Sequence, residues 1–140
     1  MGDHVSTVLT LKEADLRVTA PRIAMLRALE EHPHTTAGEL TAHVRRALGS
    51  VSMQAVYNVL EAFATAGIAR RIEPAGSAAL YETRTGDNHH HLICRGCGTV
   101  ADVDCLASAA PCLTPAVAPG FTVDEAEVVF WGHCATCLTT

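Results

Sequence analysis

Hydrophobic residues recur at the spacing of an α-helix in three stretches of the first half of the chain. Thr19 is a suitable N-cap for the first stretch, and Pro21 suits its first turn. Gly49 ends the second stretch, whereas Ser52 caps the third and Gly67 closes it. The inward positions that this spacing predicts are Ile23, Leu26 and Leu29, then Ala37, Leu40, Val44 and Leu48, then Val56, Val59, Leu60 and Phe63.

Two short runs with strand character follow the third helix. Ile68–Ile72 and Ala78–Glu82 flank the turn-forming segment Pro74–Ser77, and this order predicts a β-hairpin. Several short helices followed by a hairpin are typical of a winged helix-turn-helix domain.

The outward face of the third predicted helix is polar and consists of Gln54, Tyr57, Asn58 and Glu61. The first three of these side chains are suited to contact base edges or phosphates. Arg70 and Arg71 lie in the predicted hairpin, and Arg17 precedes the first helix. A solvated helix face would have the same periodicity, so the pattern leaves DNA binding and simple solvation open.

The second half of the chain has shorter apolar runs that are typical of an α/β domain. The runs Leu92–Ile93, Thr99–Val103 and Phe121–Trp131 predict strands, and the Pro-rich stretch 105–119 is weakly helical. We expect a small sheet with one helix. The predicted fold class is therefore α+β, with an N-terminal winged helix-turn-helix domain followed by a small α/β domain.

Charge and cysteine content also divide the 140 residues into two parts. Residues 1–80 have eight basic and eight acidic side chains, whereas residues 81–140 have two and seven. The net charge of −5, which is unusual for a DNA-binding protein, therefore belongs to the second part, as do all six cysteines. We expect a winged-helix domain over residues 1–83, a hinge over 84–88 and a metal-binding domain over 89–140.

The sequence contains no segment typical of export or of a membrane span. Met1–Thr10 lacks the basic start and long apolar run of a secretory signal. The uncharged segment 106–123 contains three prolines, and its apolar residues are mostly alanine, which does not suit a spanning helix. We expect a cytoplasmic protein with no membrane partner, in which cysteines serve metal or redox chemistry rather than a disulfide framework.

Two Cys-x-x-Cys pairs, Cys94–Cys97 and Cys134–Cys137, are the strongest chemical signal. Four thiolates in two such pairs satisfy tetrahedral zinc, and four protein ligands leave no open position for catalysis. The pairs are separated by 36 residues, so the ion would join two distant segments. Two disulfides or a thioredoxin-like redox motif are the alternatives. Neither pair follows a βαβ strand, so we expect structural zinc.

The run His89–His91 precedes the first cysteine pair. On a strand, the first and third of these histidines share one face and the second takes the other. Neutral imidazole is a common metal ligand, and His34 and Glu82 are able to complete a mixed nitrogen and oxygen site. Such a site suits Fe²⁺, Mn²⁺, Zn²⁺, Co²⁺ or Ni²⁺, and the sequence does not choose among them. A solvated polar patch is the alternative.

Cys105 and Cys112 lie outside the two pairs and are about two helical turns apart. One interpretation is a pair of buried small hydrophobic residues. The other is a reversible dithiol switch, which requires exposed thiols of lowered pKa. The sequence leaves both interpretations open.

Four segments together resemble the ferric uptake regulator family of metal-dependent repressors. They are Leu16–Arg22, Val51–Tyr57, His89–Cys97 and the closing Cys134–Cys137, so the resemblance covers nearly the whole chain. Within the family, Gly86–His91, Asp102–Cys105 and Ala110–Cys112 are similar to the catalase-peroxidase repressors of actinobacteria. The resemblance implies an N-terminal winged helix and a C-terminal α/β dimerisation domain.

The resemblance also implies the metal ligands. Structural zinc would be held by Cys94, Cys97, Cys134 and Cys137. An inter-domain regulatory site for a second divalent metal would be formed by His34, Glu82, His89 and His91, with Asp102 as a further ligand. Some members have a third metal site at the positions of Asn88, His90 and Ala126. Alanine cannot ligate, so we expect this site to be absent or incomplete, with His90 facing solvent or supporting a ligand.

On the DNA side, Tyr57 matches the family's recognition-helix tyrosine, and Arg17 matches the basic residue that enters the minor groove. Many iron-sensing members have arginine at the position of Asn58, whereas peroxide-sensing members have asparagine there. Peroxide sensors that oxidise their own histidines tend to have aspartate where this chain has Glu82, which favours a thiol mechanism.

We therefore expect a homodimer that binds palindromic double-stranded operator DNA when metal is bound and releases it upon oxidation. Its targets would be a catalase-peroxidase gene and its own gene. The alternative is an iron- or zinc-uptake repressor of the same family.

Two enzyme classes use similar residues. A zinc hydrolase or deaminase places His and Glu around an ion with an open position, but no H-x-E signature stands beside the cysteines. Glu82 also suits a ligand better than a base. A thiol oxidoreductase would need Cys-x-x-Cys after a βαβ strand. We therefore expect no catalytic residue, no small-molecule substrate and no enzymatic activity.

Overall fold

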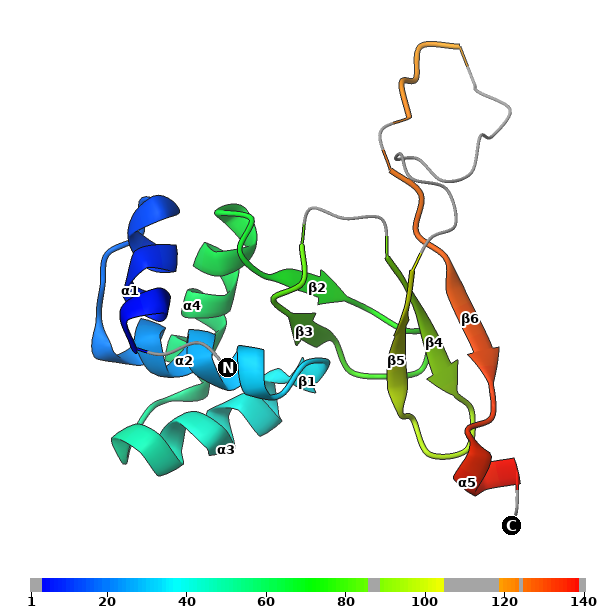
Figure 1. The fold of residues 1–140 in the computed structure, drawn as a ribbon, viewed down its shortest axis with the longest axis horizontal. Coiled ribbons are helices and arrows are strands. Elements are labelled where there is room, and N and C mark those ends of the chain that lie inside the picture. Colours follow the sequence, from blue (N-terminus) through cyan, green and yellow to red (C-terminus); the bar gives the residue numbers. More distant parts are fainter. Residues whose placement is uncertain (1–3, 86–88, 105–118, 124, 139–140) are drawn as a thin grey trace. The chain divides into compact units, whose positions relative to one another are not determined.

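The computed structural model divides into two compact units, Met1–Gly86 and Asp87–Thr140, and each has its own three-stranded sheet (Figure 1). The division lies inside the expected hinge. The residues that the structure describes are 4–85, 89–104, 119–123 and 125–138.

The described part of the first unit contains the helices α1 (His4–Glu13), α2 (Ala20–Glu31), α3 (Ala37–Leu48) and α4 (Met53–Thr65). The last three are the helices that the hydrophobic spacing predicts. Both predicted N-caps are confirmed, because the Thr19 hydroxyl accepts the Arg22 N–H at 3.3 Å and the Ser52 hydroxyl accepts the Ala55 N–H at 3.0 Å. Gly49 follows α3 with a φ of +89°, a conformation that favours glycine.

The hydrophobic core of the first unit is formed by α1 to α4 and by the sheet. Most of its side chains are at the predicted inward positions, and Phe63 is the largest of those fully buried. Burial of each large aliphatic or aromatic side chain contributes about 1.5–3 kcal/mol. The fully buried hydrophobic side chains of this core are Leu11, Met25, Leu26, Leu29, Leu40, Val44, Val56, Leu60 and Phe63.

Two features of these helices differ from the sequence pattern. The pattern does not predict α1, because this helix has no continuous hydrophobic stripe and buries only Thr7 and Leu11. Leu11 nevertheless packs into the common core. The inward placement of Leu48 was wrong: it is 39% exposed, since it is the last residue of α3 and lies beyond the core.

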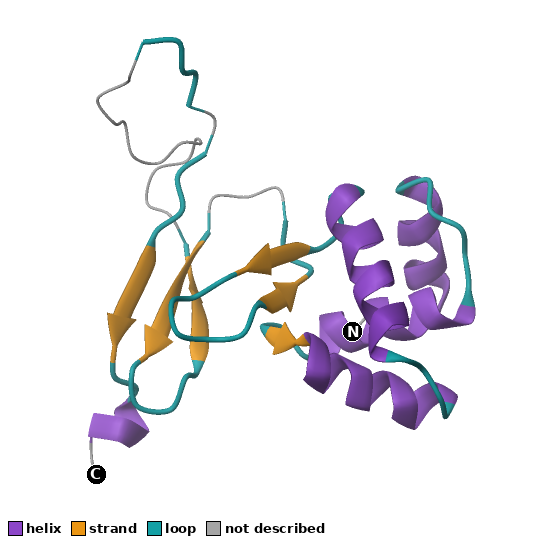
Figure 2. Ribbon diagram, turned by 180° about the vertical axis from the view of Figure 1, so that it is seen from behind, coloured by secondary structure: helices purple, strands orange, loops and turns teal. Residues whose placement is uncertain are grey.

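The predicted hairpin is present as β2 (Arg70–Ile72) and β3 (Leu80–Glu82), which pair antiparallel. A two-residue strand, β1 (Thr35–Thr36), pairs with the other edge of β3 and gives the order β1-β3-β2 (Figure 2). The sequence does not predict β1, because two residues are too few to show a period. Its pairing sets Thr35 opposite Tyr81 and fixes the segment that leads into α3.

The second unit has the strands β4 (His90–Cys94), β5 (Val100–Val103) and β6 (Val129–Gly132), in the order β5-β4-β6. The central strand β4 pairs antiparallel with β5 and parallel with β6. A single-turn helix, α5 (Ala135–Leu138), follows β6. The small predicted sheet is therefore confirmed, and with the first unit it gives the α+β class.

The predicted strand Phe121–Trp131 was too long. Only Val129 to Trp131 of that run are in β6, and residues 121–123 and 125–128 have no strand pairing. The weakly helical prediction for 105–119 falls almost entirely outside the described residues. None of the helices that the structure describes is long and apolar enough to cross a membrane.

A capping box at the start of α3 generates the first prediction. The Thr36 hydroxyl accepts the Glu39 N–H at 3.1 Å, and the Glu39 carboxylate accepts the Thr36 N–H at 3.1 Å. Thr36→Ala removes one half of this box and should lower the free energy of unfolding by about 1 kcal/mol. Thermal denaturation followed by circular dichroism measures the change. Thr65→Ala, at an exposed position on α4, is the matched control and should leave the melting temperature unchanged.

Candidate metal centres

The parallel pairing of β4 with β6 brings the two Cys-x-x-Cys pairs together. Cys94 is the last residue of β4 and lies opposite Gly132, the last residue of β6. The chain then continues directly into the second pair, with Cys134 just before α5 and Cys137 within it. The four cysteines that the sequence assigned to one ion are therefore neighbours.

The four sulfur atoms have the spacing of a tetrahedral metal site. All four Sγ atoms lie within 4.8 Å of one another, and the Sγ atoms of Cys97 and Cys134 are 3.8 Å apart. An ion with metal–sulfur bonds of about 2.3 Å places tetrahedral sulfur ligands about 3.8 Å from each other. Disulfides would need sulfurs about 2 Å apart. The four residues are all free cysteines, so this arrangement is that of an ion site and not of two crosslinks.

The local electrostatics also fit a cation. Backbone N–H groups, first that of Cys134 and then that of Cys97, lower the pKa of the Cys94 thiol to about 5. The neighbouring sulfurs, Cys94 first, raise the pKa of the Cys137 thiol to about 12. The raised pKa arises mainly because the Cys137 thiol donates its proton to these sulfurs, and charge repulsion from Cys134 adds to it. A bound dication would offset half of the charge of four thiolates and so favour the loss of all four protons.

A glycine inside the first pair makes room for this cluster. A Cβ atom on Gly96 would lie 2.8 Å from Cys137 Sγ, closer than side-chain carbons approach other atoms. Arg95 helps to hold the turn: its N–H donates to the Gly132 carbonyl at 2.7 Å, and its guanidinium lies 5.3 Å from the Trp131 ring centroid. Neither residue was predicted from the sequence to support the metal site. The glycine within the first cysteine pair was the one signal in the sequence for this close approach.

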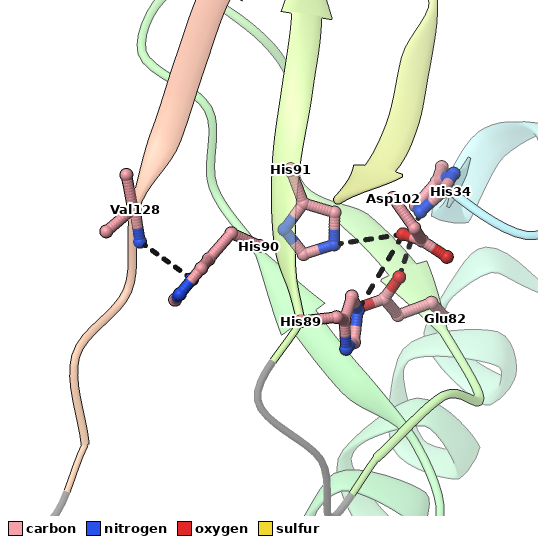
Figure 3. Close-up of polar contacts among 7 residues, drawn as sticks. All are labelled: His34, Glu82, His89, His90, His91, Asp102 and Val128. Atoms are coloured by element: carbon pink, nitrogen blue, oxygen red, sulfur yellow. Dashed lines mark hydrogen bonds and ion pairs between the residues drawn. The ribbon is translucent and has the colours of Figure 1, made fainter. Parts of the chain in front are cut away.

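The histidine run places two imidazoles against one carboxylate within the second unit. His91 lies opposite Asp102 in the β4–β5 pairing, and its Nε2 is 3.5 Å from Asp102 Oδ1 (Figure 3). His89 Nε2 is 3.7 Å from the same oxygen, and the two imidazole rings are 4.9 Å apart. The expectation that His89 and His91 share a face is confirmed. Because Asp102 of β5 is the pairing partner of His91 in β4, its carboxylate lies next to both imidazoles.

His90 takes the other direction, as strand alternation predicts. Its Nδ1 accepts the Val128 N–H at 3.2 Å, a contact from β4 to the residue before β6 (Figure 3). Asn88 lies outside the described residues, and Ala126 has no donor atom. His90 is buried, with 4% of its surface exposed, so the expectation that it faces solvent was wrong. The structure gives it a backbone contact and shows no ligand set around it in the described part of the chain.

His34 and Glu82 form a pair within the first unit. His34 Nε2 lies 2.9 Å from Glu82 Oε2 (Figure 3). His34 directly precedes β1 and Glu82 ends β3, so the β1–β3 pairing brings them together. His34 has a φ of +61°, which is in the left-handed region and is unusual for a residue with a side chain.

The expected regulatory ligands thus form two donor clusters, one in each unit. The first-unit cluster is His34 and Glu82; the second-unit cluster is His89, His91 and Asp102. Two donors are few for a transition metal, and three leave at least one position open. Cys105 and Cys112, the predicted redox pair, lie outside the described residues.

The predicted DNA-contacting residues of the first unit are exposed. Gln54, Tyr57 and Asn58 lie on the outer face of α4, and Tyr57 is 46% exposed. Gln54 Nε2 donates to Asn58 Oδ1 at 3.0 Å, so these two amides are held side by side one turn apart. Arg17 is also exposed, and its carbonyl accepts a hydrogen bond from the Arg22 guanidinium. The outer face of α4 offers amide groups, and the segment before α2 offers an arginine, of the kinds that read base edges and phosphates.

Comparison with known proteins identifies relatives over almost the whole length. The model of the ferric uptake regulator family matches residues 13–123. The transcriptional regulator FurA of Mycobacterium tuberculosis is 55% identical over 127 residues, which are 91% of this chain and 86% of that protein. Ferric uptake regulation protein 1 of Mycolicibacterium fortuitum is 50% identical over 136 residues, 97% of this chain and 84% of its own.

A solved structure shares the fold. The ferric uptake regulator of Vibrio cholerae superposes with a TM-score of 0.64 at 28% identity, covering 90% of this chain and 98% of its own. These relatives are named as regulators and not as enzymes, as the sequence led us to expect.

The contact between Gly96 and Cys137 generates the second prediction. Gly96→Ala should displace the Cys137 sulfur and reduce the tightly bound metal of the purified protein to less than half an ion per chain. Elemental analysis together with titration of free thiols measures this. Gly38→Ala is the matched control, because a Cβ there meets nothing closer than 3.9 Å. Equal metal content in both variants would contradict the importance of the close approach.

Proposed function

The chain belongs to the ferric uptake regulator family of metal-responsive transcriptional regulators, and we propose that it represses transcription as a homodimer on palindromic operator DNA. The observation that carries the proposal is the exposed face of α4, where Gln54, Tyr57 and Asn58 project from a capped helix within a helix-and-hairpin unit. A protein that acts on DNA would reside in the cytoplasm.

Structural zinc is proposed for the four-cysteine cluster. A cluster of four sulfurs selects zinc among the common divalent ions, and no ligand position remains open for chemistry. Bound there, zinc would tie the first cysteine pair, at the end of β4, to the segment that follows β6. Its role would be to hold the second unit folded.

The regulatory metal is proposed to bridge the two donor clusters. Ligands from His34 and Glu82 of one unit and from His89, His91 and Asp102 of the other would restrict the units to one relative orientation. The nitrogen and oxygen donors suit Fe²⁺, Mn²⁺, Zn²⁺ or Ni²⁺. In a dimer, this restriction would fix the distance between the two α4 helices near one turn of DNA. Shifting the equilibrium almost completely requires a preference of about 5.5 kcal/mol for the closed orientation.

Peroxide is proposed as the signal and a catalase-peroxidase gene, with the protein's own gene, as the target. Support comes from the resemblance of Gly86–His91, Asp102–Cys105 and Ala110–Cys112 to catalase-peroxidase repressors, together with the 55% identity to FurA. Asn58 also supports peroxide as the signal, because the resemblance associates asparagine at this position with peroxide-sensing members. Iron- or zinc-uptake repression is the second candidate, favoured by the name of the 50% identical relative from Mycolicibacterium fortuitum.

Selection from a random duplex library tests the function. Protein loaded with zinc and Mn²⁺ should select a palindrome and bind it with two chains per duplex, and a chelator that removes only the weaker metal should release it. Fluorescence anisotropy gives the affinity. Tyr57→Ala removes a contact of the recognition helix, so it should weaken binding to the duplex at least tenfold. A tenfold change in affinity corresponds to about 1.4 kcal/mol. Thr65→Ala is the folded control. Equal affinity with and without the second metal would refute metal-dependent repression.

Measurements of transcripts in cells distinguish peroxide from iron or zinc as the signal. Deletion of the gene should raise the catalase-peroxidase transcript if peroxide defence is controlled, and iron- or zinc-uptake transcripts if the alternative holds. In vitro, peroxide should release the selected duplex. Alkylation of the remaining thiols followed by mass spectrometry then distinguishes protection of Cys105 and Cys112 from added oxygen on His89 or His91.

Bridging makes a separate prediction about the second metal. His34→Ala and His91→Ala remove a donor from different units, and each should weaken Mn²⁺ binding at least about 100-fold, because even residues behind the ligands contribute 10–100-fold. Isothermal titration measures the affinity at constant zinc. His4→Ala, an exposed histidine on α1, is the control. Wild-type affinity in His34→Ala would restrict the site to the second unit and end the bridging model.

A further inference from the structure

The chain has three methionines, and the two that the structure describes differ in their exposure to solvent. Met25 is fully buried in the core of the first unit, whereas Met53 is 40% exposed. Met1 lies outside the described residues. Peroxides oxidise a thioether more readily the more accessible its sulfur is. Of the two methionines that the structure describes, Met53 is the more exposed residue and is therefore the candidate for oxidation, and Met25 serves as an internal reference.

The Met53 sulfur has a specific contact between helices. The Thr41 hydroxyl of α3 lies 3.0 Å from Met53 Sδ and 2.7 Å from the Ala37 carbonyl oxygen. A hydroxyl has one proton, so the sulfur and the carbonyl share a single donor. Thr41 is buried, with only 2% of its surface exposed. The thioether thus joins the first residue of α4 to a buried polar group of α3.

The place of Met53 on α4 links this contact to the DNA-binding face. Met53 is the first helical residue, directly after the N-cap Ser52 and directly before Gln54. Tyr57 follows one turn later and is exposed. A shift of the first turn of α4 therefore moves the groups that the proposed function places on DNA.

We propose that Met53 is a peroxide-modified site, and that its sulfoxide weakens operator binding independently of the cysteines and of the bound metal. The inference rests on the proposed function, which makes α4 the recognition helix. In the reaction the sulfur lone pair attacks one oxygen of hydrogen peroxide, so that the S–O bond forms and the O–O bond breaks. The proton on the transferred oxygen passes to the departing hydroxide, which leaves as water. The thioether is oxidised, and hydrogen peroxide is reduced to water.

The product is larger and more polar than the thioether. The new oxygen is attached to a sulfur that already lies 3.0 Å from Thr41 Oγ1, and it is a stronger acceptor than sulfur. It competes with the Ala37 carbonyl for the single Thr41 proton and pushes the first turn of α4 outward. Methionine sulfoxide reductases reverse the change, so the response is a reversible one.

The experiment uses the full chain with Cys105→Ser and Cys112→Ser, loaded with zinc and with Mn²⁺, which does not drive iron-type histidine oxidation. This background is compared with the same protein carrying Met53→Leu, which keeps the size of the side chain and removes the sulfur. Both are treated with hydrogen peroxide. Peptide mass spectrometry reads oxygen on Met53 and Met25, and anisotropy reads affinity for the selected duplex.

The expected result is one added oxygen on Met53 with Met25 unmodified, and a loss of affinity of about tenfold, equivalent to the loss of one base contact. Sulfoxide reductases A and B together should restore binding, and Met53→Leu should retain it. Oxidised Met53 with unchanged affinity would overturn the inference, as would equal loss in Met53→Leu. Failure of the untreated protein to select any duplex would instead refute the proposed function.

Discussion

Strand β4 contributes to both candidate metal centres of the second unit, and its pairing on both edges fixes them together. Its parallel pairing with β6 sets Cys94 beside the second cysteine pair, and its antiparallel pairing with β5 sets His91 opposite Asp102. A slip of one residue in either register would turn these side chains to the opposite face. The contact from Val128 to His90 is a further tie against such a slip.

The features predicted well from the sequence are those with a local physical cause. Thr19 and Ser52 cap helices because their hydroxyls satisfy amide groups only three residues away, and the hydrophobic spacing marks which faces of α2, α3 and α4 are buried. The two cysteine pairs were recognisable because four thiolates at this spacing have few uses other than binding one ion.

The features missed depend on partners distant in the sequence. β1 is a strand only because β3 lies beside it, and α1 has its place only because Leu11 completes a core built by other helices. The need for glycine at position 96 comes from a sulfur 41 residues later in the chain. Hydrophobic periodicity does not report contacts between distant residues. It therefore predicted a strand longer than β6 and placed Leu48 in the core.

The extent of β4 has a consequence for the order in which the protein acquires its metals. His91 and Cys94 are three residues apart on one strand, a distance of about 10 Å. An ion among the sulfurs would anchor the end where β4 meets β6 and would reinforce the pairing that holds His91 in register with Asp102. Filling the sulfur cluster would therefore favour binding at the histidine cluster. Zinc depletion would weaken the response to the second metal without removing any of its ligands.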